Sequence, residues 1–346
     1  MKSIFTISLD FELHWGGFEK WPLQIKTAIH RPPGYQPTHP TEYSQYFLNT
    51  RQVIPDMLAL FGHYEVHVTW ATVGLLMHST REELLANAPE QQPTYHTREL
   101  SAYHYIDHSG IGSDENSDPF HFAASLVTEI LRVPHQELGT HTFAHYYCQE
   151  PGQTPEQFGD DLRAAQRAAK RFGVQLQSLV FPRNQFNQQY LRIAYQEGIR
   201  AVRSNPADWF WKIESTQHEP WLKRLARGLD AYVPIGKRSS YPLSSVRQLP
   251  DIPVCLPSSR LLRPYRPQER LFSASRVTRI KQEMDRAVRD GSVYHVWWHP
   301  HNFARHPEQN LADLKTLLEH FSVCRRRGMV SLNMGETVHL LPYARA

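Results

Sequence analysis

Two carboxylates follow the first apolar run of the chain. Residues 2–9 (KSIFTISL) are rich in β-branched and aromatic side chains, which is typical of a buried strand. The run leads directly into Asp10-Phe11-Glu12, and residues i and i+2 of an extended chain point to the same face, so we expect Asp10 and Glu12 to lie together. Two close carboxylates can divide the work of a hydrolase, one as a base and the other as a metal ligand or an acid. Two solvated acids at a strand edge are the alternative interpretation.

A pair of histidines follows another predicted strand. Residues 137–139 lead into His141-Thr-Phe-Ala-His145, and in a helix the spacing i, i+4 would bring both imidazoles to one face, where they could chelate a divalent ion. The intervening Glu of HExxH metallopeptidases is missing. The chain has 20 histidines, so the position after a strand favours a site more than the spacing does. Other pairs share the spacing, among them His63/His67 and His104/His108.

Polar side chains also stand at the ends of two further predicted strands. Trp297 and His299 share one face of the strand at 292–299, and a histidine at such a strand end can act as a general acid or base. Arg183 follows the strand at 176–181 and could pair with a carboxylate. The alternatives are a hydrogen-bonded core histidine and a surface arginine.

Strands and helices alternate on either side of these residues. A capping-box pattern, Thr154-Pro-Glu-Gln157, predicts the start of one helix. The predicted strands are 2–9, 65–73, 137–139, 176–181, 200–203, 292–299 and 329–332. The predicted helices are 51–64, 155–171, 188–197, 273–290 and 308–327, with a long ordered loop at 14–50 and an irregular segment at 89–120. This alternation predicts an α/β fold with a mainly parallel sheet.

Composition excludes several classes of protein. The chain has 346 residues, of which 40% are hydrophobic, so it can bury a sizeable core. A net charge of +4 argues against bulk nucleic-acid binding, and there is no run of 18 apolar residues for a transmembrane helix. The apolar stretch 4–9 is too short and is followed too closely by acids for a secretory signal. The missing secretory signal and the three cysteines, which lack metal-type spacing, favour a cytoplasmic protein.

One segment differs in composition from the rest. Residues 221–270 contain ten Lys or Arg against three Asp or Glu and are rich in proline. We interpret them as a basic Pro/Arg-rich insertion within a single domain that spans residues 1–346.

Together the strand-end clusters resemble, in order and spacing, the polysaccharide deacetylases of the NodB-homology type, carbohydrate esterase family 4. The resemblance covers about residues 3–340. One departure is that the family's two adjacent acids are separated here by Phe11. The matching segments are 8–12 (SLDFE), 141–145 (HTFAH), 181–183 (FPR), 208–209 (DW) and 298–299 (WH).

The resemblance implies a distorted (β/α)7 barrel with long loop insertions and a bound divalent metal ion. The family's ligand positions correspond to Glu12, His141 and His145, although Asp10 could replace Glu12 as the carboxylate ligand. Such a ligand set fits Zn²⁺ first, with Co²⁺, Ni²⁺ or Mn²⁺ as other metals that could serve.

The same resemblance implies the catalytic roles. Asp10 would be the base, Arg183 would orient it, and His299 would be the acid. The implied reaction removes an N-acyl group, in most of the family an N-acetyl group, from an aminosugar. Hydrolysis of another non-peptide C–N bond, or carbohydrate binding without catalysis, are the alternatives.

Substrate contacts are the least constrained prediction. Tryptophans could stack on sugar rings, and a backbone N–H near Tyr146 could hold the oxyanion. We expect Arg260, Arg263 and Arg266 near the barrel mouth, where they would attract a diphosphate-linked aminosugar. The alternative hypothesis is a basic face that binds anionic lipid. The predicted substrate residues are Trp15, Tyr146, Asp208, Trp209, Trp297 and Arg263.

Overall fold

A curled, mainly parallel sheet forms the centre of the computed structural model, which describes residues 2–23, 41–205 and 239–341. The strand order is β6-β5-β4-β3-β2-β1-β8-β7, each neighbouring pair is parallel, and β9 adds to β1. The strands are β1 Ile4–Phe11, β2 Val68–Thr72, β3 Gln136–Thr140, β4 Ser178–Leu179, β5 Ala201–Ser204, β6 Val254–Pro257, β7 Arg260–Leu261, β8 Val293–Trp298 and β9 Val330–Ser331. The predicted distorted barrel is confirmed.

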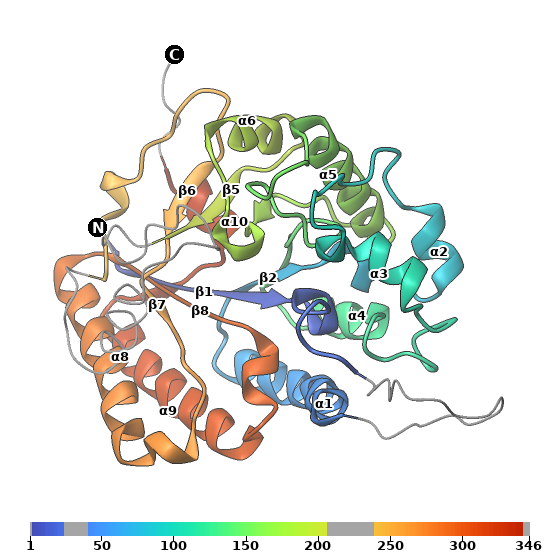
Figure 1. Cartoon of the computed structure of the whole chain (residues 1–346). Helices are drawn as coiled ribbons and strands as arrows, with labels where there is room; N and C mark the ends of the chain where they lie inside the picture. Colours follow the sequence, from blue (N-terminus) through green and yellow to red (C-terminus); the bar gives the residue numbers. More distant parts are fainter. Residues whose placement is uncertain (1, 24–40, 206–238, 342–346) are drawn as a thin grey trace.

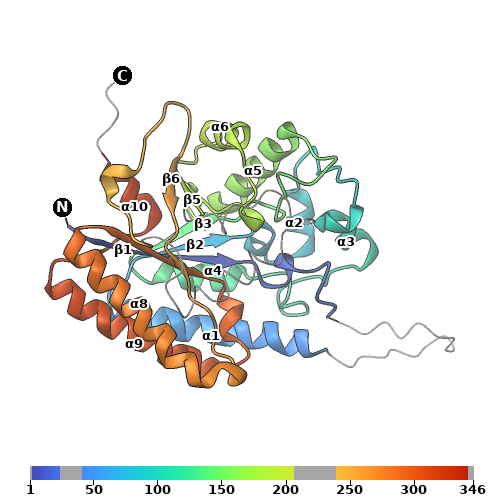
Figure 2. The same ribbon diagram turned by 60° about the vertical axis from the view of Figure 1, so that its left-hand side comes forward.

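Helices cover both faces of this sheet (Figure 1). Figure 2 shows α1, α8 and α9 on one side and α5 and α6 on the other. All eight residues of β1 are buried, as expected of a parallel strand covered on both faces. The helices are α1 Glu42–His63, α2 Arg81–Ala86, α3 Ala102–His108, α4 Ala124–Arg132, α5 Pro155–Lys170, α6 Gln188–Gln196, α8 Arg270–Asp290, α9 Pro307–Arg326 and α10 Met334–His339.

Local signals placed some elements well and others poorly. α5 begins where the capping box predicts, with the Thr154 hydroxyl accepting from the Gln157 N–H and the Gln157 side chain accepting from the Thr154 N–H. α1 begins at Glu42, well before the predicted residue 51, and runs through Pro55. The basic segment 221–270 is not only an insertion, because β6 and β7 lie within it and belong to the sheet.

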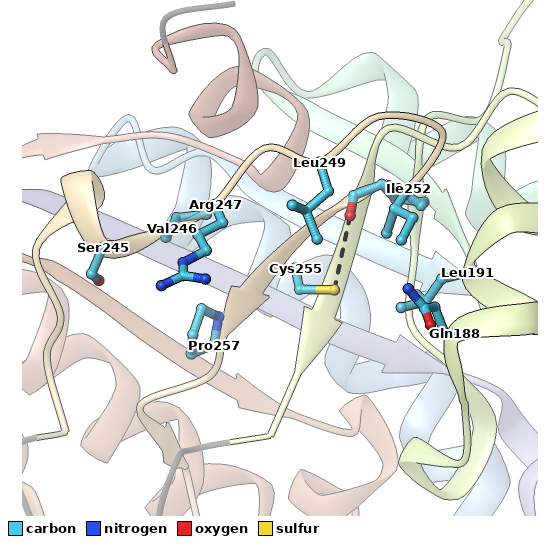
Figure 3. A pocket seen from close by; sticks show the side chains of 10 residues that line it. Gln188, Leu191, Ser245, Val246, Arg247, Leu249, Ile252, Cys255 and Pro257 are labelled. Carbon is cyan, nitrogen blue, oxygen red and sulfur yellow. Dashed lines mark hydrogen bonds between the residues drawn. The ribbon is translucent and has the colours of Figure 1, made fainter. Parts of the chain in front are cut away.

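The sheet edge formed by β6 carries a hollow of about 290 Å³. Figure 3 shows Cys255 at its centre, with Leu191 from α6 on one side and Leu249 from the preceding loop nearby. The Cys255 thiol contacts the carbonyl of Pro253 at 3.8 Å. This hollow contains none of the residues predicted to do chemistry.

Within the described ranges, no helix is both long and apolar enough to cross a membrane.

Candidate active site

The predicted catalytic residues gather at the carboxyl ends of neighbouring strands. Asp10 is near the end of β1 and Glu12 follows it, His141 follows β3, and His299 follows β8. β1 lies between β2 and β8, and β3 pairs with β2. The carboxyl ends of parallel strands meet at one edge, so residues far apart in sequence converge there.

Glu12 is the centre of this cluster. It is buried, and its Oε2 lies 2.8 Å from Nε2 of His145 and 3.7 Å from Nε2 of His141. The ligand atoms of these three residues all lie within 4.8 Å of one another. A Cβ at Gly16 would lie 2.2 Å from the Glu12 carboxyl carbon, so glycine at position 16 leaves the space that the carboxylate occupies.

The His141–His145 segment is a loop and not the helix that the spacing suggested. Thr142 and His145 adopt the left-handed backbone conformation, with φ of 63° and 54°. The buried carboxylate of Asp161, on α5, accepts from the N–H groups of Phe143 at 2.6 Å and Ala144 at 3.0 Å. The two imidazoles are therefore brought together by a folded turn that α5 holds in place.

Hydrogen bonds fix the orientation of both imidazoles. Nδ1 of His141 donates to the carbonyl of Val180 at 2.7 Å, which leaves Nε2 as the unprotonated atom facing Glu12. Nδ1 of His145 lies 3.0 Å from the Tyr147 hydroxyl. Burial lowers the pKa of His141 to about 4, so its ring is neutral at neutral pH. A neutral imidazole with a fixed partner on its other nitrogen is the usual state of a metal ligand.

Asp10 is held by an arginine that sequence reasoning missed. Nη1 and Nη2 of Arg203, on β5, donate to Oδ1 and Oδ2 of Asp10 at 2.5 and 2.7 Å. Burial alone would raise the pKa of Asp10, but Arg203 above all, with His299 and His141, holds that pKa below its usual value. The Arg203 guanidinium also lies 4.2 Å from the centroid of the Trp297 ring. An arginine at the end of the predicted strand 200–203 was the available signal, since a charge in a buried strand needs a partner.

Arg183, predicted to orient Asp10, lies elsewhere. It pairs with Glu19 at 2.5 Å and Glu150 at 3.4 Å, and its guanidinium lies 3.9 Å from the Tyr147 ring centroid. Its left-handed backbone, with φ of 53°, follows the short strand β4 and directs the side chain to these partners. The prediction for Arg183 is therefore corrected, and Arg203 takes that place.

His299 contacts both carboxylates from the open side of the cluster. Its Nε2 lies 3.0 Å from Oε1 of Glu12 and 3.7 Å from Oδ2 of Asp10, and 26% of its side chain is exposed. Burial lowers the pKa of His299, but Glu12 and then Asp10 outweigh burial, so the net shift is upward. A histidine that keeps its proton beside two carboxylates is suited to donate it.

His301 is a further neighbour of His299 and Glu12 that the sequence analysis did not predict. It is buried, its ring centroid lies 4.9 Å from that of His299, and it forms a second possible ligand set with Glu12 and His299. The sequence His299-Pro-His301, directly after a predicted buried strand, was the signal that could have found it.

The structure places most of the predicted substrate residues that it describes in the core or in hydrogen bonds within the chain. Trp15 is buried and its indole N–H donates to the carbonyl of His121, which makes it a core residue. The Tyr146 N–H donates to the Thr142 hydroxyl at 2.7 Å, so it is not free to hold an oxyanion. Trp297 is largely buried and meets the His299 ring edge-on. Asp208 and Trp209 lie outside the described residues.

The three predicted phosphate-binding arginines do not act alike. Arg260 is buried and makes two hydrogen bonds of 2.7 Å to the Glu283 carboxylate. Arg263 is partly buried and Arg266 is exposed. Arg260 is therefore paired with Glu283 inside the fold and is not part of an exposed phosphate-binding surface.

A second, larger cavity lies outside the cluster and is lined by none of Asp10, Glu12, His141, His145 and His299. It has a volume of about 1010 Å³ and is lined by residues that follow Glu12 in the chain, including Phe18 and Glu19, and by Tyr105 of α3. Glu19 connects it to the Arg183–Tyr147 pair beside His145. Its size is that of a small-molecule site.

Comparisons with known proteins identify the fold. No protein-family profile and no curated protein matches the chain. Among solved structures, a polysaccharide deacetylase candidate from Mycobacterium smegmatis aligns with a TM-score of 0.56 and 13% identity over 98% of this chain and 90% of that one. A probable polysaccharide deacetylase from Pseudomonas aeruginosa PAO1 aligns with a TM-score of 0.54 and 11% identity over 97% and 89%. The Puue allantoinase aligns with a TM-score of 0.53 and 10% identity over 97% and 89%.

At these identities the likeness concerns the fold. The chain has the fold of the polysaccharide deacetylases, the NodB type of distorted (β/α)7 barrel. Its chemistry has to be argued from its own residues.

Proposed function

We propose that this protein is a metal-dependent hydrolase that removes an N-acyl group, most simply N-acetyl, from an aminosugar. The observation that carries the proposal is the buried Glu12 carboxylate, whose oxygens face the imidazoles of His141, His145 and His299. Two histidines and one carboxylate are a ligand set of catalytic zinc sites, which keep a position open for water and substrate.

The fit to a metal ion rests on the orientation of the ligands. Nε2 of His141 and Nε2 of His145 both face Oε2 of Glu12, while their Nδ1 atoms are engaged elsewhere. A divalent ion held by these three residues would supply Lewis-acid chemistry, acidifying water and polarising an amide carbonyl. Zn²⁺ fits the set best, and Co²⁺, Ni²⁺ or Mn²⁺ could serve.

The remaining site residues handle protons. Arg203 keeps Asp10 ionised and fixed by two hydrogen bonds, so Asp10 can accept the proton of the attacking water. His299, held protonated by Glu12 and Asp10, can give its proton to the departing nitrogen. The C–N bond then breaks to give a free amine and a carboxylic acid.

The finer identity of the substrate remains a prediction. The fold neighbours named as deacetylases make a carbohydrate the first choice of substrate. A diphosphate-linked substrate, a lipid-surface contact and a cytoplasmic location rest on the sequence, and the pairing of Arg260 with Glu283 weakens the first two.

The test is acetate release from N-acetylglucosamine oligomers by protein stripped of metal and reloaded with Zn²⁺. We expect release that depends on Zn²⁺ and is lost in Asp10→Asn. Full activity of Asp10→Asn would overturn the proposal. Oligomer binding without acetate release would favour a carbohydrate-binding protein without catalysis. Hydrolysis of a non-sugar amide alone would favour a hydrolase of another non-peptide C–N bond.

A further inference from the structure

A second histidine–carboxylate cluster lies at the opposite end of the strands. His67 immediately precedes β2, His135 immediately precedes β3, and Glu336 lies on α10. The ligand atoms of these three residues lie within 4.8 Å of one another. β2 and β3 are paired neighbours, so their amino ends hold the two histidines side by side.

Hydrogen bonds fix the backbone and the carboxylate of this cluster. The Val68 N–H donates to the carbonyl of His135 at 3.3 Å, which links the two histidine segments directly. The Glu336 carboxylate accepts from the Asn333 N–H at 3.0 Å as part of the capping box of α10. Its Oε2 also lies 2.6 Å from Nδ1 of His67. The carboxylate is thus already aimed at the histidine pair.

The cluster is open to solvent, unlike the site around Glu12. The His67 and Glu336 side chains are 18% and 36% exposed, and His135 is exposed. The His67 and His135 rings stack with centroids 3.9 Å apart and an interplanar angle of 3°. Parallel rings cannot both point at one ion, so binding requires the exposed His135 ring to rotate outward.

We propose that His67, His135 and Glu336 form a second divalent metal site of the zinc class, distinct from the site of the proposed hydrolase. Two imidazoles and a carboxylate from three separate segments suit Zn²⁺, Ni²⁺ or Co²⁺ and leave positions for water. An ion there would join α10 to the amino ends of β2 and β3. Because α10 packs against β1, β2 and β5, the ion would stabilise the end of the barrel away from Glu12.

The experiment measures bound Zn²⁺ per chain by equilibrium dialysis and elemental analysis. Wild type should bind about two ions, His141→Ala about one, Glu336→Gln about one, and the double variant none. Glu336→Gln keeps a capping-box residue at its position, and so preserves the start of α10. His135→Asn is the second variant, because asparagine tolerates the left-handed conformation that His135 holds at φ 66°.

A matched control removes a histidine from another stacked pair. His104 and His108 on α3 also stack with centroids 3.9 Å apart, and His108→Ala should retain about two ions. If Glu336→Gln and His135→Asn both retain as much Zn²⁺ as wild type, the second site does not exist. A single ion in wild type that only His141→Ala removes would overturn this inference and leave the proposed hydrolase intact. A single ion that only Glu336→Gln removes would support the second site and overturn the metal site of the proposed hydrolase.

Discussion

The two ends of the barrel hold similar side chains in opposite settings. At the carboxyl end, Glu12, His141 and His145 are buried. The other nitrogen of each imidazole is engaged by a fixed partner, the Val180 carbonyl or the Tyr147 hydroxyl. At the amino end, His67 and Glu336 are partly exposed and bond to each other, which a metal ion would replace. The comparison teaches that burial and fixed partners, more than residue type, separate the proposed catalytic site from the proposed stabilising one.

The largest contrast is expected from the same substitution at the two ends. Glu12→Gln should abolish hydrolysis and remove the ion between His141 and His145, because the amide cannot supply an anionic ligand. Glu336→Gln should leave the hydrolysis rate unchanged. Steady-state kinetics with metal analysis measures both, and equal losses of activity would show that the two ends do not differ in the proposed way.

Removing the proposed acid should have the next largest effect. General acid–base groups contribute about 10²–10⁴-fold in rate, so His299→Ala should lower kcat by that amount with bound Zn²⁺ retained. The His299 side chain is partly exposed, so we expect the variant to fold. A rate equal to wild type would make His299 a structural residue.

Replacing Arg203 should shift the pH profile of hydrolysis. Arg203 lowers the pKa of Asp10, so Arg203→Gln should raise that pKa and move the acidic limb of kcat/KM to higher pH. Arg183→Gln is the matched control, since its partners are Glu19 and Glu150 and not Asp10. The alkaline limb should lie above the ordinary histidine value of 6.5, because the pKa of His299 is raised and the acid must stay protonated. An acidic limb that moves in Arg183→Gln and stays in Arg203→Gln would contradict the assignment.

The smallest effect is expected on stability at the amino end. Zn²⁺ at about 100 times its dissociation constant stabilises a folded chain by about 2.7 kcal/mol, so it should raise the Tm of His141→Ala by a few degrees. Glu336→Gln in the same background should remove that rise, as followed by circular dichroism. An unchanged rise would place the stabilising ion elsewhere.

Sequence predicted the parts of the molecule that depend on neighbours in the chain. The capping box at Thr154 and the buried strand before Asp10 are local, and both are confirmed. The loop conformation of His141–His145 could not be predicted from its spacing, because it depends on Asp161 of α5 accepting from two of its N–H groups.

Partners that are distant in sequence were predicted less well. His67 was noted for its spacing from His63, yet its neighbour in space is His135. Arg183 and Arg203 both stand near the end of a strand, and of the two it is Arg203, within β5, that pairs with Asp10. Such pairings follow from the strand order, which local patterns do not contain.

Phe11 is the last residue of β1 and separates Asp10 from Glu12, which constrains the register in which the chain can fold. Its ring meets Trp70 edge-on, with centroids 6.1 Å apart, on the face of β1 opposite Asp10 and Glu12. A slip of β1 by one residue would place both carboxylates in the core and Phe11 at the site. Such a chain would have no stable barrel, so we expect no slipped form with weakened activity. Every folded molecule should carry all the side chains of the proposed site, and the active fraction of a metal-loaded preparation should equal its folded fraction.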